Sequence, residues 1–313
     1  MNPTIYTTLL IAFLLMACSR TTAEDVKDDA IKSTIPSAEQ KEEAPKENSL
    51  SPEIQSLLQE ANSAIQNKRN LDAKDAQDQT LLMRCIAANQ LDQAKQLLDA
   101  GADIEAVDAF SQTALFKAHT AEAIKLLTDH GADVNHIAHF KETALMLAYD
   151  HKSVQALIDA GADVYAKADY DKTCLHYPKD GQATALLLKS GIKADIKDIY
   201  HQTPLMFAED TDSVKVLLEA GANPRAIADN GSNALFYPKS PEALKLLIAA
   251  GIDINAKDQF GSTPLRYQRQ PEAIRLLLQT GADPHIKDVD GKLAMDYHSN
   301  PEIIKLLQEA IKP

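Results

Sequence analysis

The chain has 313 residues and a formal net charge of −13 at pH 7, from 45 acidic and 32 basic residues. No basic stripe interrupts this acidic balance, which argues against binding to nucleic acid and against tight adhesion to anionic lipid. Hydrophobic residues make up 45% of the chain, but aromatic residues make up only 5% and Trp is absent. We therefore expect a core built in thin layers from Ala, Leu and Ile, not one large globular core.

The chain begins with a short apolar segment. Leu9 to Ala17 is an uninterrupted apolar run of nine residues. It is too short to span a bilayer as a mature helix, but it has the length of a signal-peptide core. The run ends in Leu15-Met-Ala-Cys18, which resembles the lipobox of bacterial lipoproteins.

The lipobox resemblance implies that residues 1–17 are a signal peptide, that the thiol of Cys18 is lipidated, and that the protein faces the periplasm. Ser19 follows the cysteine, where inner-membrane lipoproteins carry the Asp that retains them. An outer-membrane anchor is therefore expected. A plain cleaved signal peptide and a misassigned start of the chain are the alternatives.

Residues 18–50 have a different composition from the rest of the chain. After Cys18 they are rich in Glu, Lys, Asp, Ser, Thr and Pro and contain almost no large apolar side chain. Such a segment cannot bury enough surface to become ordered. We predict a flexible tether with an average reach of about 30 Å by random-coil scaling.

Residues 51–313 are predicted to form a folded repeat domain. A helix from Pro52 to about Gln66 would cover its N-terminal end. A glycine then recurs every 30 residues. A fixed period of this size indicates copies of one supersecondary unit, each of which buries its apolar face against its neighbours. The glycines are Gly101, Gly131, Gly161, Gly191, Gly221, Gly251 and Gly281.

Each copy contains the same local motifs. A first helix starts at Thr-Pro-Leu in the copies that contain Thr203 and Thr263, a leucine-rich second helix follows, and Gly-Ala-Asp comes after it. This pattern resembles the ankyrin repeat over residues 70–313. The resemblance implies an all-α solenoid with short β-hairpin loops, built from about eight helix pairs after the N-terminal cap.

The copies depart from the ankyrin pattern in one respect. The distance from Thr80 to Gly101 is 21 residues, but from Thr113 to Gly131, and in every later copy, it is 18. Three residues are about one turn of helix. We therefore predict that the first helix is short from the second copy onward. Each recurring glycine is predicted to close the second helix in a left-handed conformation.

Cysteine chemistry is expected to play no part in the repeat domain. Cys85 and Cys174 are three repeats apart. Neighbouring helices pack 8 to 10 Å apart, which separates the two residues by roughly 25 to 30 Å, far beyond the reach of a disulfide. Both are predicted to be buried and reduced.

The sequence offers no catalytic constellation. His136 and His139 fall on one predicted hairpin, but no HExxH or Cys-x-x-Cys motif accompanies them, and a metal site needs three or four ligands. We expect no enzymatic activity, no bound metal and no cofactor, and a metal-dependent enzyme is the weakest alternative. The loop carboxylates are expected to accept backbone hydrogen bonds; these are Asp103, Asp133, Asp163, Asp253 and Asp283.

The tips of the predicted hairpins are the candidate binding surface. The ankyrin resemblance implies recognition through hairpin tips and through the concave-facing ends of the first helices. Five of the seven residues that stand nine positions after each glycine are aromatic, in a chain with only sixteen Phe and Tyr. Aromatic side chains contribute strongly to interfaces, although each could instead pack on the next hairpin. The five are Phe110, Phe140, Tyr170, Tyr200 and Phe260.

Further residues extend this candidate surface. Val107, Ile137, His139 and Ile199 stand beside the aromatics, and His119 and Tyr149 at the ends of short helices are expected to border them. A contiguous exposed apolar patch usually marks an interaction site, so the first half of the solenoid is favoured. A second aromatic register is predicted to be mostly core; it comprises Tyr177, Phe207, Tyr237, Tyr267 and Tyr297.

These observations predict a monomeric, non-catalytic module that binds a neutral or basic protein partner. In the periplasm it would serve as a scaffold or accessory factor for an envelope complex. The alternative is an immunity protein that masks the active site of a toxin delivered into the periplasm.

Overall fold

The computed structural model describes residues 50–237 and 239–312. The predicted signal peptide, Cys18 and nearly all of the tether lie outside these residues. The described residues belong to one compact unit that starts at Leu50. Within this part of the chain, no helix is both long enough and apolar enough to cross a membrane.

The described part of the domain consists of a cap helix followed by eight helix pairs, as predicted, with two short 3-10 turns, η2 (His139–Lys141) and η3 (Asp169–Asp171), in the loops. The cap is α2 (Pro52–Asn67). The first members of the pairs are α3 (Leu81–Ala87), η1 (Ala114–Lys117), α6 (Ala144–Leu147), η4 (Cys174–His176), α9 (Pro204–Phe207), η5 (Ala234–Phe236), η6 (Pro264–Arg266) and η7 (Ala294–Tyr297). The second members are α4 (Leu91–Asp99), α5 (Ala121–Asp129), α7 (His151–Asp159), α8 (Gly181–Lys189), α10 (Thr211–Glu219), α11 (Pro241–Ala249), α12 (Pro271–Gln279) and α13 (Pro301–Ile311).

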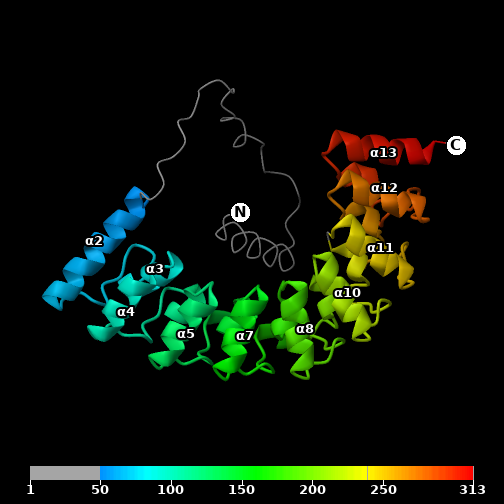
Figure 1. Ribbon diagram of the computed structural model, residues 1–313. Coiled ribbons are helices and arrows are strands. Elements are labelled where there is room, and N and C mark those ends of the chain that lie inside the picture. The colour runs from blue at the N-terminus through cyan, green and yellow to red at the C-terminus, as the bar shows by residue number, and fades with distance from the viewer. Residues whose placement is uncertain (1–49, 238, 313) are drawn as a thin grey trace. The chain divides into compact units, whose positions relative to one another are not determined.

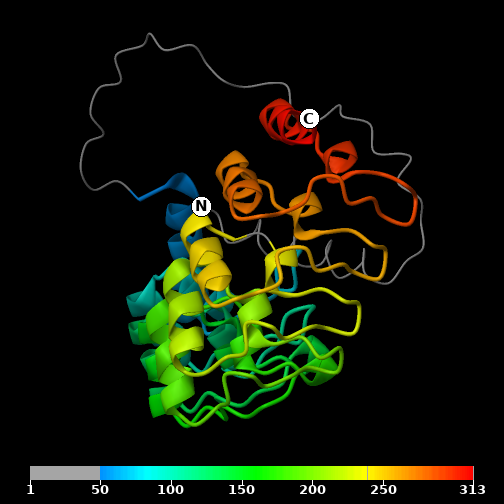
Figure 2. The same ribbon diagram turned by 90° about the vertical axis from the view of Figure 1, so that its right-hand side faces the viewer.

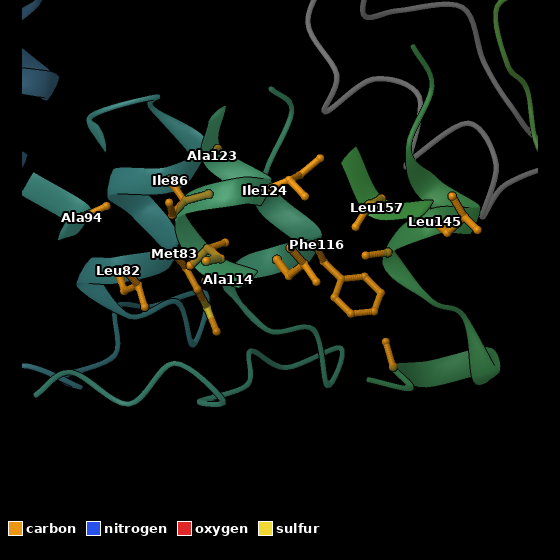
Figure 3. Packing of buried hydrophobic residues seen from close by; sticks show 14 of the residues in the cluster. Leu82, Met83, Ile86, Ala94, Ala114, Phe116, Ala123, Ile124, Leu145 and Leu157 are labelled. Atoms are coloured by element: carbon orange, nitrogen blue, oxygen red, sulfur yellow. The ribbon is translucent and has the colours of Figure 1, made fainter. Parts of the chain in front are cut away.

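The pairs stack in chain order, and the loops between them project together from one side of the stack (Figures 1 and 2). The core is a continuous series of small layers, in which each pair packs on the next. Figure 3 shows Met83 of α3 beside Ala114 of η1, two buried residues from successive pairs. Leu127 and Leu157 on successive second helices are exposed by 1% or less. This arrangement confirms a solenoid core made mostly of Ala, Leu and Ile.

The short first helix is also confirmed. Helix α3 has seven residues, whereas the first member of each later pair has only three or four. Most of these are single turns of 3-10 helix.

The recurring glycines end the second helices as predicted. Gly101 has a φ of +99°. Its amide donates to Leu98 O at 3.0 Å, and the amide of Ala102 donates to Leu97 O at 2.9 Å. These two bonds form the Schellman motif that closes a helix at a left-handed residue.

The loops are tight turns without strands. In the described residues the only β-bridge joins Lys74 and Thr80. Each loop is nevertheless closed like a hairpin by a backbone bond between its first and fifth residues, such as Asp108 N to Gln112 O at 3.0 Å. The predicted β-hairpin character is therefore limited to the turn itself.

The short first helices leave carbonyl oxygens without intrahelical donors. In four cases a buried side chain from the next repeat donates to them, a feature that the sequence analysis did not predict. The bonds are Lys179 Nζ to Met146 O at 2.6 Å, Lys239 Nζ to Met206 O at 3.1 Å and also to Ala208 O, Gln268 Nε2 to Leu235 O at 2.6 Å, and His298 Nε2 to Leu265 O at 2.8 Å.

The two lysines are unusual because they are buried. Lys179 is 4% exposed and Lys239 is 3% exposed. Burial penalises the charged ammonium and lowers the pKa of Lys179 to about 8 and that of Lys239 to about 7. Carbonyl oxygens and not carboxylates accept their hydrogen bonds, so no charge partner at hydrogen-bonding distance restores the ordinary value.

These lowered pKa values predict that the domain becomes more stable as pH rises from 7 to 8.5. The unfolded chain holds the lysine protons up to about pH 10.5, so it binds more protons than the folded state in this range. For each additional proton that the unfolded chain binds, the free energy of unfolding rises by about 1.4 kcal/mol per pH unit. Urea unfolding across this range should show a shallower rise in the free energy of unfolding for Lys239→Met than for the wild type. Equal slopes would contradict the burial of a titrating amine.

Candidate protein-binding surface

The hairpins are numbered here by the helix pair that follows each of them. Hairpin 1 comprises residues 75–79, and hairpins 2 to 8 comprise residues 108–112, 138–142, 168–172, 198–202, 228–232, 258–262 and 288–292. The hairpin-tip surface means the exposed and half-buried side chains of hairpins 2 to 8 and of the residue directly before each. All five predicted tip aromatics lie on it, with exposures of 54% for Phe110, 63% for Phe140, 41% for Tyr170, 44% for Tyr200 and 52% for Phe260.

The other predicted residues are divided between two places. Ile137 and Ile199 are exposed by 60% and 51%, His139 is exposed, and Val107 is half-buried; all four belong to the hairpin-tip surface. His119 and Tyr149 are exposed but lie in the turns between first and second helices. Those turns are at the opposite end of the short helix from its hairpin, so these two residues are not grouped with the tip aromatics.

The structure adds two exposed apolar residues to those predicted from the sequence. Ile227 is exposed by 57% and Val289 by 72%. Both could have been found from the period, because Ile227 stands six residues after its glycine, as Val107 does, and Val289 stands eight after, as Ile199 does. The apolar surface therefore extends into the second half of the solenoid, and the contrast between the two halves is smaller than predicted.

Backbone hydrogen bonds hold most neighbouring hairpin tips in register; among hairpins 2 to 8, only hairpins 3 and 4 are not joined in this way. In each case the tip carbonyl of one hairpin accepts from an amide of the next. The bonds are His139 N to Phe110 O at 3.0 Å, Ile199 N to Tyr170 O at 3.0 Å, Asp229 N to Tyr200 O at 3.0 Å, Gln259 N to Asn230 O at 2.7 Å, and Val289 N to Phe260 O at 2.9 Å. The tips thus form an ordered row and not a set of independent loops.

The tip aromatics differ in how much they pack on one another. The rings of Tyr170 and Tyr200 are tilted with centroids 5.6 Å apart, so these two partly fit the packing interpretation. Phe140, at 63% exposure, is the most exposed of the five. Burial cannot explain an aromatic at that position.

The second aromatic register has a structural role. Its five members are half-buried, and the rings of Phe207 and Tyr237 lie 5.8 Å apart. The hydroxyls of Tyr177 and Tyr267 donate to Glu142 Oε1 at 3.0 Å and Asp258 Oδ2 at 2.6 Å. Burial and the adjacent carboxylate raise the pKa of Tyr177 well above its ordinary value. These bonds tie the first helices to the bases of the hairpins.

The His and Asp side chains considered as metal-binding or catalytic groups form hydrogen bonds that stabilise the loops. His136 Nε2 lies 2.9 Å from Ser111 O, which links two hairpins. Asp103 accepts the amide of Glu105 at 2.9 Å, and the other four loop carboxylates do the same. Among the described residues, no three His, Cys, Asp or Glu side chains converge as a metal site would require.

The two repeat-domain cysteines are buried and free, as predicted. Burial raises the pKa of both thiols to about 11. The thiolate is the reactive form of cysteine, so neither residue is suited to nucleophilic chemistry near neutral pH.

Comparison with known proteins identifies the family. A family model described as ankyrin repeats (3 copies) matches residues 82–168 and 174–258, more than half of the chain. The chain belongs to the ankyrin-repeat family. Ankyrin-repeat domains are typically non-catalytic modules for protein–protein interaction, which agrees with the absence of a catalytic constellation in the sequence.

One solved structure is also similar to this chain. The crystal structure of the human ASB11 ankyrin repeat domain is similar over 75% of this chain and 99% of that chain, with 19% sequence identity and a TM-score of 0.44. No curated protein sequence matches this ankyrin-repeat protein.

Proposed function

We propose that this ankyrin-repeat protein binds a protein partner through the hairpin-tip surface and acts as a scaffold or accessory factor. The observation that carries the proposal is the row of five tip aromatics, each exposed by 41% or more. Exposed aromatic and aliphatic side chains in one contiguous row are costly to leave in water and are typical of interfaces.

The charges around the tips favour an uncharged partner surface. Lys141 Nζ lies 3.8 Å from Asp169 Oδ1, and Lys167 Nζ lies 2.9 Å from Asp171 Oδ2. Because these opposite charges face each other, hairpins 3 and 4 carry little net charge even though the whole chain is acidic. The chain's overall charge of −13 still disfavours an acidic partner.

A quantitative pull-down tests this proposal. The full chain with a C-terminal tag and a variant with Phe110→Ala, Phe140→Ala and Tyr200→Ala are used to capture proteins from periplasmic and membrane extracts. We expect one protein to be enriched by the wild type and lost by the variant. The same proteins on both baits would mean that the tip aromatics are not the binding residues.

Measuring the free energy of unfolding distinguishes a variant that has lost contacts with the partner from one that no longer folds. Phe110 and Phe140 should contribute little to packing, so each of these two substitutions should change the free energy of unfolding by no more than about 0.5 kcal/mol. Tyr200→Ala also loses the ring contact with Tyr170 and is expected to cost somewhat more. Phe236 is the matched control because it is only 6% exposed, and Phe236→Ala should cost about 3 to 5 kcal/mol.

The identity of the captured protein decides between the two proposed roles. If the captured protein is a toxin, the immunity role gains support over the scaffold role.

We also propose that the protein faces the periplasm and is anchored to the outer membrane through lipidated Cys18. The Leu15-Met-Ala-Cys18 motif and the following Ser19 support this location. Membrane fractionation tests it: the wild type should sediment with outer membranes, and Cys18→Ser should not. Equal recovery of both proteins in the soluble fraction would exclude a lipid anchor.

A further inference from the structure

Hairpins 3 and 4 have a backbone unlike that of the other hairpins. Phe140 and Lys141 have φ values of +58° and +56°, and Tyr170 and Asp171 have φ values of +63° and +59°. The other hairpins each have a single left-handed residue, which follows the tip residue. These are Asp78, Ser111, His201, Gly231, Gly261 and Gly291.

The left-handed conformation is rare for bulky residues, and consecutive left-handed residues are normally Gly, Asn or Asp. Phe140, Lys141 and Tyr170 therefore occupy a conformation that their side chains disfavour. Strain of this kind gathers at functional sites in proteins. It occurs here at the aromatic residues of two adjacent tips.

The first residue of each hairpin explains the difference. In hairpin 2, Asp108 Oδ1 accepts the amides of Phe110 at 2.9 Å and Gln112 at 3.0 Å, which holds the tip in the common conformation. Hairpins 3 and 4 begin with Ala138 and Ala168, which offer no acceptor. The same pair of bonds is made by Asp75, Asp198, Asp258 and Asp288 in their hairpins.

Hairpin 6 also begins with alanine, at Ala228, yet it keeps the common turn. There Asn230 Oδ1 accepts the amide of Ser232 at 3.1 Å and replaces one of the two lost bonds. Hairpins 3 and 4 have Phe140 and Tyr170 at the equivalent position. Phe140 has no acceptor, and the hydroxyl of Tyr170 is at the far end of its ring, out of reach of the amide two residues on. The turns of hairpins 3 and 4, in which the tip residue and the residue after it are both left-handed, are called reversed turns. They follow from the sequence of each hairpin.

Hairpins 3 and 4 expose apolar side chains, and the charged side chains around them form ion pairs. Phe140 is exposed by 63% and the neighbouring Ile137 by 60%. The charged side chains of the two tips pair with each other, Lys141 with Asp169 and Lys167 with Asp171. A charged partner surface would have to disrupt these pairs, whereas an apolar, uncharged recess would bury the aromatic rings and leave the pairs intact.

We propose that hairpins 3 and 4 determine which partner is bound, because their reversed turns aim Phe140 and Tyr170 into an uncharged, apolar recess of a protein partner. This inference rests on the proposed function of the hairpin-tip surface. It adds that the backbone conformation of these two tips, and not only their aromatic side chains, is required for recognition.

Restoring the missing acceptor tests the inference without touching an aromatic residue. The variant Ala138→Asp with Ala168→Asp should convert both tips to the common turn. Asp198 shows that such a carboxylate fits, since it is 4% exposed in the same position. The variant Ala138→Asn with Ala168→Asn supplies the same acceptor without charge. Ala228→Asp is the matched control, because hairpin 6 already has the common turn.

Two readouts are needed. Intraresidue HN–Hα NOE intensities of labelled protein, which are strong for a left-handed residue because its two protons lie close together, report whether φ of Phe140 and Tyr170 becomes negative. Titration uses the purified protein that the wild type captures in the pull-down and the tip variant loses. We expect both double variants to switch the turns and to weaken binding at least about tenfold, which is about 1.4 kcal/mol, while Ala228→Asp binds like the wild type.

The possible failures are distinct. Switched turns with unchanged affinity would overturn the inference, as would unswitched turns, because Ala138 and Ala168 would then not set the conformation. Should Phe140→Ala with Tyr170→Ala abolish binding while the turn variants do not, the proposed function stands and only this inference fails. If neither set of variants weakens binding, this inference fails, and Phe110 and Tyr200 are left to carry the proposed function of the tips.

Discussion

The structure depends on one constraint, which is that no repeat can complete its own core and most of the short first helices rely on the next repeat for hydrogen-bond donors. A first helix of three or four residues leaves carbonyl oxygens without intrahelical donors. Buried side chains from the following repeat, such as Lys179 and Lys239, supply the missing donors. The apolar layers are shared in the same way. Each repeat is therefore stable only between neighbours, which is the physical basis of a solenoid.

This constraint leaves the hairpin tips available for another role. The bases of the hairpins are held by bonds between repeats, such as those of Asn135, whose side chain accepts from Asp163 N at 2.7 Å and donates to Gly161 O at 3.2 Å. Tip side chains contribute little to these bonds or to the core, so their identity is not fixed by folding. Apolar residues that remain at the tips, such as Phe140 and Ile137, then call for a functional explanation.

The sequence predicted most of the fold because the fold is periodic. The glycine interval predicted the helix pairs, and the shorter distance from Thr113 to Gly131 predicted the short first helix. The buried amine of Lys239 could not be predicted, since lysine is almost always exposed and its acceptors lie more than thirty residues earlier in the chain. The sequence contains a signal for the reversed turns, namely Ala138 and Ala168 where most hairpins begin with Asp. Its meaning is clear only once the structure is known.

The most direct test of the account is hydrogen–deuterium exchange of the full chain, alone and saturated with the captured partner. Exchange reports local opening along the whole backbone, so it locates the contact without any substitution. The account predicts slower exchange on binding at residues 137–141 and 167–171, with no change in α5, α7 and α8. Protection of those second helices with unchanged hairpin tips would contradict it.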